Sequence, residues 1–247
     1  MKTVLITGCS SGFGLETARY FLDRDWQVIA TMRTPREDLM PRSERLRVLA
    51  LDVTDPDSIR NAVLAAGPID ALINNAGIGM LAALEGTSMQ IAREVFETNT
   101  FGTIAMTQAV LPQFRQRNAG VVVNITSSVT LKSLPLLSVY TASKAAINAF
   151  TESLALELQP FNVRVSLVLP GRAPDTSFGE NARSRMQGNS PDAYAAFAQS
   201  IFARMGQPSP VTRARDVAEA VWRAVNDPSC PVRIAAGADA VALAESS

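Results

Sequence analysis

Apolar residues along this chain fall into short runs that alternate with stretches of helical spacing. Runs rich in Val, Ile and Leu and bounded by Gly, Pro, Asn or Asp indicate buried strands, and an apolar residue at every third or fourth position indicates a helix. Strands are predicted over Thr3–Thr7, Gln27–Thr31, Val48–Leu51, Ala71–Ile73, Val121–Ile125, Val163–Leu169 and Val232–Ala235. Because strands that alternate with helices form parallel sheets, the pattern predicts an α/β fold.

The segments between these runs carry the helical pattern. Helices are predicted over about Gly12–Asp23, Asp55–Ala66, Ser88–Arg117, Tyr140–Leu158 and Arg213–Asn226, the third with a kink near Asn99–Gly102. From residue 172 to about 206 the pattern becomes irregular, with prolines, glycines and scattered aromatic residues. We expect residues 172–206 to form short helices and loops that make a lid over the mouth of a site.

Composition limits the size and the partners of the protein. A chain of 247 residues with 47% hydrophobic content can bury the core of one α/β domain, so residues 1–247 are expected to form a single domain. Lys plus Arg and Asp plus Glu both number 23, and the sequence has no basic stripe with interleaved aromatic residues. A nucleic-acid partner is therefore not expected.

The residue inventory excludes several kinds of site. The chain has no His and two cysteines, Cys9 and Cys230, which excludes a His-based catalytic triad and a Cys/His metal site and leaves Tyr, Lys or a carboxylate as the catalytic base. No apolar stretch approaches the roughly 18 residues of a membrane span, and the N-terminus lacks the pattern of a signal peptide. We expect a cytoplasmic protein without a metal or a membrane partner.

Glycines cluster directly after the first predicted strand. They allow a tight loop that admits a ligand's backbone, and the helix beginning near Gly12 directs free N–H groups at that position. An anion fits there. The loop residues that would contact it are Gly8, Ser10, Ser11, Gly12, Phe13 and Gly14. The alternative is an ordinary strand-to-helix turn.

The ends of the second and third strands bear on the choice of cofactor. In a dinucleotide-binding βαβ unit an acidic residue at the end of the second strand binds the adenine ribose, whereas an Arg accommodates a 2′-phosphate. Met32 and Arg33 hold this place, which favours NADP(H) over NAD(H) unless Arg33 is a solvated surface residue. After the third strand, Asp52, followed by Val53, can hydrogen-bond an adenine amino group or cap the next turn.

Polar residues follow the next two strands and interrupt a helix. The fourth strand runs into Asn74–Gly77, and the fifth delivers Thr126–Ser128 at its carboxyl end, the edge where open parallel sheets bind ligands. Asn99 interrupts an apolar helical stretch, and a buried amide there must find partners. Hydroxyls and amides at strand ends also commonly close turns.

Tyr140 and Lys144 lie four residues apart on one face of a predicted helix. Bringing a Tyr pKa from about 10 to near 7 requires roughly 4 kcal/mol. One cation about 4 Å away contributes about that much at an effective dielectric constant of about 20. A Lys144 ammonium is therefore expected to make Tyr140 a working acid or base near neutral pH, although such pairs also occur by chance on surfaces.

In this order, the motifs resemble those of the short-chain dehydrogenase/reductase family over essentially the whole chain. They are Thr7-Gly8-x3-Gly12-x-Gly14, Asn74-Asn75-Ala76-Gly77, Asn99, Ser127, Tyr140-x3-Lys144 and Pro170-Gly171. The resemblance implies a single doubly wound Rossmann domain of about seven largely parallel strands with helices on both faces. It also implies NAD(P) across the strand ends and hydride transfer at a carbonyl or alcohol carbon, with most likeness to the NADPH-using carbonyl and hydroxysteroid reductases.

The resemblance assigns roles residue by residue. Tyr140 would donate the proton in reduction, and Lys144 would lower its pKa and hold the nicotinamide ribose. Ser127, with Ser128 as the alternative, would bind the substrate oxygen, and Asn99 would anchor a water that relays protons. The further implied cofactor contacts are Asp52, Val53, Asn75, Ala76, Gly77, Pro170, Gly171 and Thr176.

The chain departs from the family pattern after its Pro-Gly pair. The family places a Thr a few residues later to contact the nicotinamide carboxamide, but here Arg172 comes directly after Gly171 and three further residues precede Thr176. This departure leaves the role of Thr176 open and places a cation near the site.

Three functions fit these motifs. The first is an NADPH-dependent reductase of a ketone or aldehyde, reversible as an alcohol dehydrogenase. The second is a non-catalytic dinucleotide-sensing regulatory protein, which would not need the four catalytic residues. The third, a sugar-nucleotide epimerase, usually has a larger C-terminal domain than 247 residues allow.

The helix after Tyr140 carries apolar residues on two faces. Ile147, Phe150, Leu154 and Leu158 are expected to face the sheet, while the opposite face carries Ala142, Ala145, Ala146, Ala149 and Leu156. Small apolar residues suit close packing against another helix rather than solvent. We therefore expect a homodimer or homotetramer.

Overall fold

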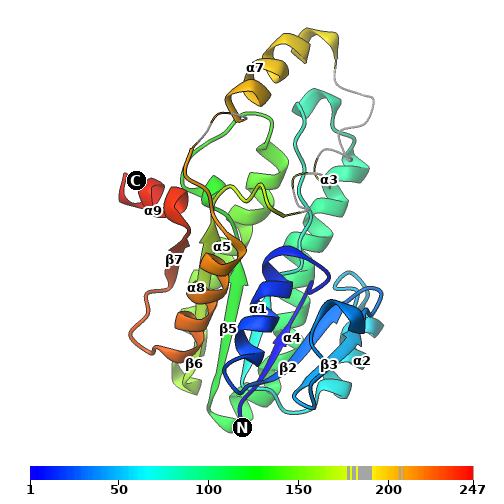
Figure 1. Ribbon diagram of the computed structural model, residues 1–247, viewed down its shortest axis with the longest axis vertical. Coiled ribbons are helices and arrows are strands. Elements are labelled where there is room, and N and C mark those ends of the chain that lie inside the picture. The colour runs from blue at the N-terminus through cyan, green and yellow to red at the C-terminus, as the bar shows by residue number, and fades with distance from the viewer. Residues whose placement is uncertain (177–178, 180–181, 183–190, 206, 208, 247) are drawn as a thin grey trace.

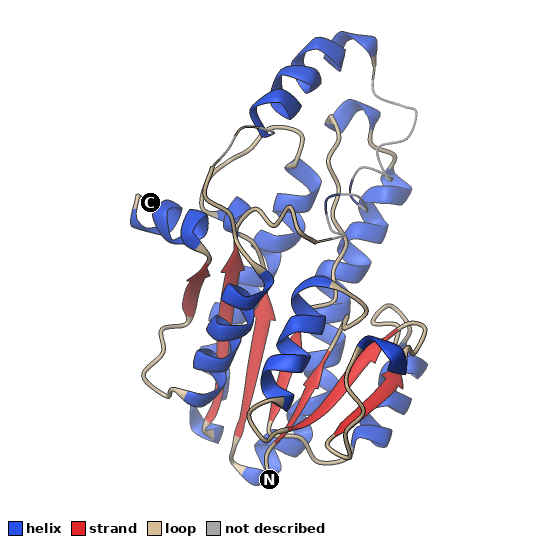
Figure 2. Cartoon of the chain, in the orientation of Figure 1, coloured by secondary structure: helices blue, strands red, loops and turns tan. Residues whose placement is uncertain are grey.

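The computed structural model describes residues 1–176, 179, 182, 191–205, 207 and 209–246. Its seven strands form one parallel sheet in the order β3-β2-β1-β4-β5-β6-β7, with all arrows pointing the same way in Figure 2. They are β1 (Thr3–Ile6), β2 (Gln27–Met32), β3 (Leu46–Ala50), β4 (Ala71–Asn74), β5 (Gly120–Ile125), β6 (Val163–Pro170) and β7 (Arg233–Ala236). The strand order reverses between β1 and β4, which confirms the doubly wound α/β fold.

Helices cover both faces of this sheet (Figure 1). One face packs against α1 (Gly12–Leu22) and α8 (Ala214–Asn226). The other packs against α2 (Pro56–Ala66), α4 (Gly102–Arg117) and α5 (Ser138–Leu158). Along β1, Val4 and Ile6 point into the first core and Leu5 into the second, as the two-residue period of a strand buried on both faces requires.

The predicted strands match the observed ones to within two residues at each end. The largest difference is at β3, which begins at Leu46 because that residue pairs with Val28 of β2. The helix predicted over Asp55–Ala66 begins at Pro56, and its N-terminus is capped by Asp55, whose carboxylate accepts a hydrogen bond of 2.9 Å from the Asp57 N–H. A short C-terminal helix, α9 (Ala238–Glu245), was not predicted.

The predicted kink near Asn99 is a π-helical turn. Glu97–Phe101 joins α3 (Met89–Phe96) to α4 and buries both Asn99 and Thr100. Single π-turns within α-helices occur frequently at functional sites. The kink is therefore confirmed, and its form brings a polar side chain into the interior.

A buried polar network joins the two central strands to the helices behind them. Asn74 and Asn124 pair in register, and Asn74 Nδ2 donates to Asn124 Oδ1 at 2.9 Å and to Thr107 Oγ1 at 3.0 Å. Asn124 Nδ2 donates to Thr151 Oγ1 at 2.8 Å. All four side chains are buried, so β4, β5, α4 and α5 are held together just below the carboxyl edge of the sheet.

Part of the segment predicted as a lid, residues 191–205, lies in the described part of the chain. It contains α7 (Ala195–Met205), which stands above the rest of the chain in Figure 1. Residues 177–178, 180–181, 183–190 and 206 fall outside the described residues, so the lid stays a prediction. Among the described residues no helix is both long and apolar enough to cross a membrane.

Candidate active site

Asn75 ties the glycine loop to the edge of the sheet. Its Nδ2 donates hydrogen bonds to the carbonyls of Thr7 at 2.9 Å and Gly8 at 3.1 Å. In return, Thr7 Oγ1 accepts the N–H groups of Asn75 at 3.0 Å and Ala76 at 2.9 Å. A Cβ at Gly14 would overlap Asn75 Nδ2, and one at Gly8 would lie 2.8 Å from Ala76 Cα. These glycines are therefore required by the protein's own packing.

The N-terminus of α1 is prepared for an anion. Within the described residues no side chain caps this helix, and its first turn has no acidic residue, whereas Asp55 caps α2. Gly12 has φ +56, and Ser10 and Ser11 are exposed. Free N–H groups at a helix N-terminus bind phosphates. The loop thus fits the phosphate group of a dinucleotide.

Tyr140, Ser127 and Lys144 come together at the carboxyl end of β5. The Tyr140 hydroxyl hydrogen-bonds with the Ser127 side chain, which favours Ser127 over the alternative Ser128. Lys144 Nζ donates to the carbonyl of Ile125, the last residue of β5, at 2.9 Å. Tyr140 is 6% exposed and Lys144 is 5% exposed, so both polar ends lie in the protein interior.

Burial dominates the protonation of this pair. It raises the pKa of Tyr140 to about 12, although the hydrogen bond with Ser127 acts in the opposite direction. Burial also lowers the pKa of Lys144 to about 8. In this structure desolvation is the largest influence on both pKa values, because burial disfavours the charged form of each group, and a lowering of the Tyr140 pKa by Lys144 stays a prediction.

Asn99 finds its partners within the protein. Its Oδ1 accepts the Ile78 N–H at 2.8 Å, and its Nδ2 donates to the Ile78 carbonyl at 3.0 Å and to Ser143 Oγ at 3.1 Å. The buried amide is therefore satisfied by protein groups, and its anchoring of a water stays a prediction. A Cβ at Gly77 would lie 3.2 Å from Asn99 Oδ1 and 3.4 Å from Lys144 Nζ, so Gly77 lies between these two residues.

The predicted adenine end of the site lies at the ends of β2 and β3. Arg33 is exposed directly after β2. Asp52 Oδ1 accepts hydrogen bonds from the Thr54 N–H at 3.0 Å and the Thr54 hydroxyl at 2.7 Å. The Thr54 N–H, the Thr54 hydroxyl and the Arg33 charge, in decreasing order, hold the pKa of Asp52 below its usual value. Asp52 thus caps the turn, as the second interpretation predicted, while Val53 is buried against Gly102.

The turn after β6 lies at the carboxyl edge of the sheet as well. Pro170 is the last residue of β6, and the Gly171 N–H donates to Thr212 Oγ1 at 2.8 Å. Thr176 lies beside the glycine loop, with its Cβ 3.5 Å from where a Cβ of Gly12 would be. The structure therefore brings Thr176 and Gly12 together, and a contact between Thr176 and a carboxamide stays a prediction.

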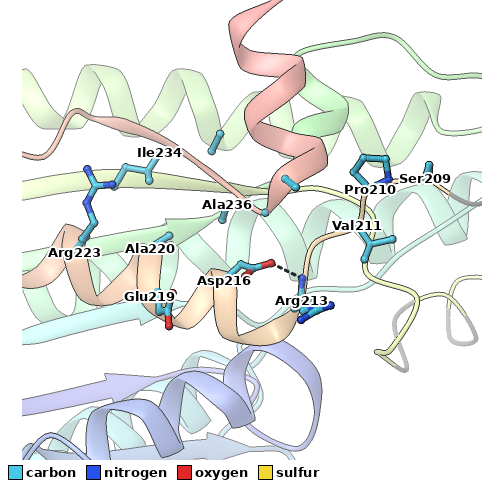
Figure 3. A pocket seen from close by; sticks show the side chains of 13 residues that line it. Ser209, Pro210, Val211, Arg213, Asp216, Glu219, Ala220, Arg223, Ile234 and Ala236 are labelled. Carbon is cyan, nitrogen blue, oxygen red and sulfur yellow. Dashed lines mark hydrogen bonds between the residues drawn. The ribbon is translucent and has the colours of Figure 1, made fainter.

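A surface cavity of about 670 Å³ lies elsewhere, between α8 and β7 (Figure 3). Its lining includes Arg213, Asp216, Glu219 and Arg223 and none of the residues predicted to act in catalysis or cofactor binding. The Arg213 N–H donates to the Asp216 carboxylate at 2.8 Å, which caps α8. We therefore do not place the reaction in this cavity.

The family model for short chain dehydrogenases matches residues 2–187. The chain belongs to this family. Among its relatives is retinol dehydrogenase 8 of Bos taurus, which is 34% identical over 259 residues, covering 94% of this chain and 80% of the relative. The protein is thus an oxidoreductase of the short-chain dehydrogenase family.

Solved structures of other short-chain dehydrogenases share the fold. One from Streptomyces avermitilis has a TM-score of 0.83 and 33% identity, covering 99% of this chain and 91% of the other. One from Burkholderia cenocepacia, in complex with NADP, has a TM-score of 0.79 and 28% identity, covering 99% and 93%. The single doubly wound domain of this short-chain dehydrogenase agrees with both.

Sequence reasoning about this short-chain dehydrogenase missed residues that support the site. Ser143 Oγ donates to the Tyr140 carbonyl at 2.7 Å and accepts from Asn99, which joins α5 to the π-turn. In the sequence, the position of Ser143 directly before Lys144 could have indicated this role. Thr212 and Asp239, which hold the turn after β6, lie far along the chain and have no motif of their own.

We predict that Lys144 makes folding more favourable as the pH rises above about 8. The folded state releases this proton near pH 8, whereas the unfolded chain holds it to about 10.4, so the unfolded state binds more protons between these values. The free energy of unfolding should therefore rise by about 2 kcal/mol between about pH 8 and about pH 10, relative to the Lys144→Met variant. Urea unfolding of both proteins across this range measures the difference.

The exposed Lys132 provides the control. The Lys132→Met variant should keep the pH dependence of the unsubstituted protein. If the difference between the unsubstituted protein and Lys144→Met stays constant with pH, the depressed Lys144 pKa is contradicted.

Proposed function

We propose that this short-chain dehydrogenase is a carbonyl reductase, which transfers hydride between NADP(H) and a ketone or aldehyde, or a secondary alcohol in reverse. The observation that carries the proposal is the hydrogen bond between Ser127 and Tyr140, beside the buried Lys144. Two hydroxyls that meet at the ligand-binding edge of a parallel sheet can hold one substrate oxygen between them. That arrangement is what proton transfer to a carbonyl oxygen requires.

The glycine loop and the edge around it would hold the cofactor. The uncapped N-terminus of α1 would bind its phosphates, and Arg33 would pair with the 2′-phosphate of NADP(H). Gly77 leaves room beside Lys144, which would contact the nicotinamide ribose. When bound, the nicotinamide ring supplies or accepts the hydride. NADP in the similar Burkholderia structure supports this choice of cofactor.

The raised pKa of Tyr140 bears on the direction of the reaction. Because burial holds that pKa at about 12, the phenol keeps its proton at neutral pH and can donate it to a substrate oxygen. Ser127 would hydrogen-bond the same oxygen and orient it. A protonated Tyr140 is the form that reduction of a carbonyl requires, because the substrate oxygen must receive a proton.

We predict that Tyr140→Phe lowers kcat by about 10²–10⁴-fold, the usual contribution of a general acid. The substitution keeps the ring and removes the hydroxyl, so NADPH affinity should remain. Lys144→Ala should lower both kcat and NADPH affinity, because Lys144 would also contact the cofactor. Initial rates over a panel of carbonyl compounds, followed by NADPH absorbance, and cofactor titrations measure these effects.

Tyr20→Phe is the matched control, since Tyr20 lies on α1 against Trp222 and should leave kcat unchanged. A dinucleotide sensor would bind NADPH, turn over no carbonyl and lose affinity in Lys144→Ala. If a substrate is found and Tyr140→Phe reduces it at the original rate, the catalytic assignment is wrong.

We predict that NADPH binds more tightly than NADH and that Arg33→Ala removes most of this preference. A charge-assisted contact contributes roughly 1.5–3 kcal/mol, which corresponds to about 10- to 150-fold in affinity. Titration of both cofactors into both proteins measures the ratio. Arg60→Ala, on the exposed side of α2, should leave the ratio unchanged. Equal affinities of the unsubstituted protein for NADPH and NADH would contradict the role of Arg33.

We further propose that the outer face of α5 joins two copies of the chain. Ile147, Leu154 and Leu158 are buried as predicted, whereas Ala142, Ala145 and Ala149 are exposed and Leu156 is 67% exposed. Sedimentation at micromolar concentration should show at least a dimer. Ala149→Glu should yield monomers, because it places charges in the helix interface. Leu64→Glu, at an exposed position on α2, is the control and should leave the oligomer intact. A monomeric unsubstituted protein would refute this assembly.

A further inference from the structure

Two residues outside the predicted site hold the turn that follows β6. Thr212, just before α8, accepts the Gly171 N–H at 2.8 Å, and its own N–H donates to the Arg172 carbonyl at 2.8 Å. Asp239, in the first turn of α9, accepts the Arg172 N–H at 2.6 Å and the Thr212 hydroxyl at 2.7 Å. Thr212 and Asp239 thus satisfy the backbone of the turn and also bond each other.

The packing around this junction admits no extra atoms. A Cβ at Gly171 would overlap the Asp239 carboxylate, so the carboxylate lies directly against the backbone of the turn. Gly237, between β7 and α9, has φ +93, and a Cβ there would overlap Thr212 Oγ1. Glycine is therefore needed at both places, and the junction fixes α9 against the carboxyl end of β6.

The contacts of Thr212 and Asp239 hold one end of a segment that extends to the glycine loop. From Arg172 the chain passes through a turn at Ala173–Thr176, in which Thr176 Oγ1 donates to the Ala173 carbonyl at 2.9 Å, and ends beside Gly12. Helix α9 also packs against the 3₁₀ turn Ser128–Thr130, which follows Ser127. One helix therefore contacts the segments that leave both β5 and β6, and Figure 1 shows it just beyond the end of β7.

We propose that Thr212 and Asp239 are positioning residues that fix the turn Pro170–Arg172 for the nicotinamide half of the cofactor. This inference rests on the proposed function together with the family resemblance, which implies cofactor contacts at Pro170 and Gly171 and a contact to the nicotinamide carboxamide a few residues later. Neither Thr212 nor Asp239 touches cofactor or substrate; both act through the backbone of the turn. Because misplacement of a reacting group by about 1 Å can cost roughly 10²-fold in rate, a loosened turn should slow hydride transfer.

The test compares a nicotinamide-containing ligand with a fragment that lacks nicotinamide. Thr212→Val removes the hydroxyl at nearly constant shape, and Asp239→Ala removes the carboxylate that accepts the Arg172 N–H and the Thr212 hydroxyl. Each should lower kcat by about 10- to 100-fold and weaken NADPH binding, while affinity for adenosine 2′,5′-bisphosphate stays within about twofold. Thr212→Ser, which keeps the hydroxyl, should restore most of the rate. Glu245→Gln, at an exposed position on α9, is the matched control.

Each outcome decides the inference. A purely structural role would weaken binding of NADPH and of the fragment together, and unchanged kcat and affinities would show no role; either result overturns the inference but leaves the proposed function standing. If the unsubstituted protein binds NADPH without turnover, the ratio of the two affinities alone decides. If the unsubstituted protein binds NADH instead of NADPH, the same test uses NADH in place of NADPH and ADP in place of adenosine 2′,5′-bisphosphate. If it binds no dinucleotide, the proposed function fails and the inference fails with it.

Discussion

The structure at the carboxyl edge of the sheet depends on the close approach of the Asn75 side-chain amide to the glycine loop. Asn75 Nδ2 lies so close to Gly8 and Gly14 that a single methyl group at Gly14 would displace it. The amide bonds the carbonyls of Thr7 and Gly8, so β1, β4 and the loop between β1 and α1 form one rigid unit. A ligand would meet a loop that is already shaped, because its form is set by contacts within the protein.

The second organising effect is desolvation. Tyr140 and Lys144 are carried into the interior on consecutive turns of α5, and each is shifted toward its neutral form. Lys144 is held by a backbone carbonyl and Tyr140 by a hydroxyl, partners that satisfy hydrogen bonds without supplying charge. The spacing of the two residues predicted that they lie on one face of the helix, and both are buried there. It gave no measure of the cost of removing both side chains from water, and in this fold that cost outweighs the Coulomb attraction expected between them.

Hydrophobic periodicity was sufficient to predict the strands, because the central strands are buried on both faces, whereas the doubly wound parallel sheet was implied by the family resemblance. It also located the kink at Asn99, since a polar residue interrupted an apolar helix. It could not give the partners of Asn99, which include the backbone of Ile78, 21 residues away. The bond from Arg172 to Asp239 spans 67 residues, and α9 is a short helix of small residues, so neither left a local pattern.

The π-turn at Glu97–Phe101 sets the rotational phase between two helices that would otherwise be one. Val95 of α3 packs in a small cluster with Met80 and Ala82, whereas Met106 of α4 packs into the core that covers one face of the sheet. Each residue added to a helix rotates all later residues by about 100°. Losing one residue from this turn would restore a regular α-helix and swing the buried stripe of α4 away from the sheet. The spacing between Asn99 and the core of α4 is therefore intolerant of insertions and deletions.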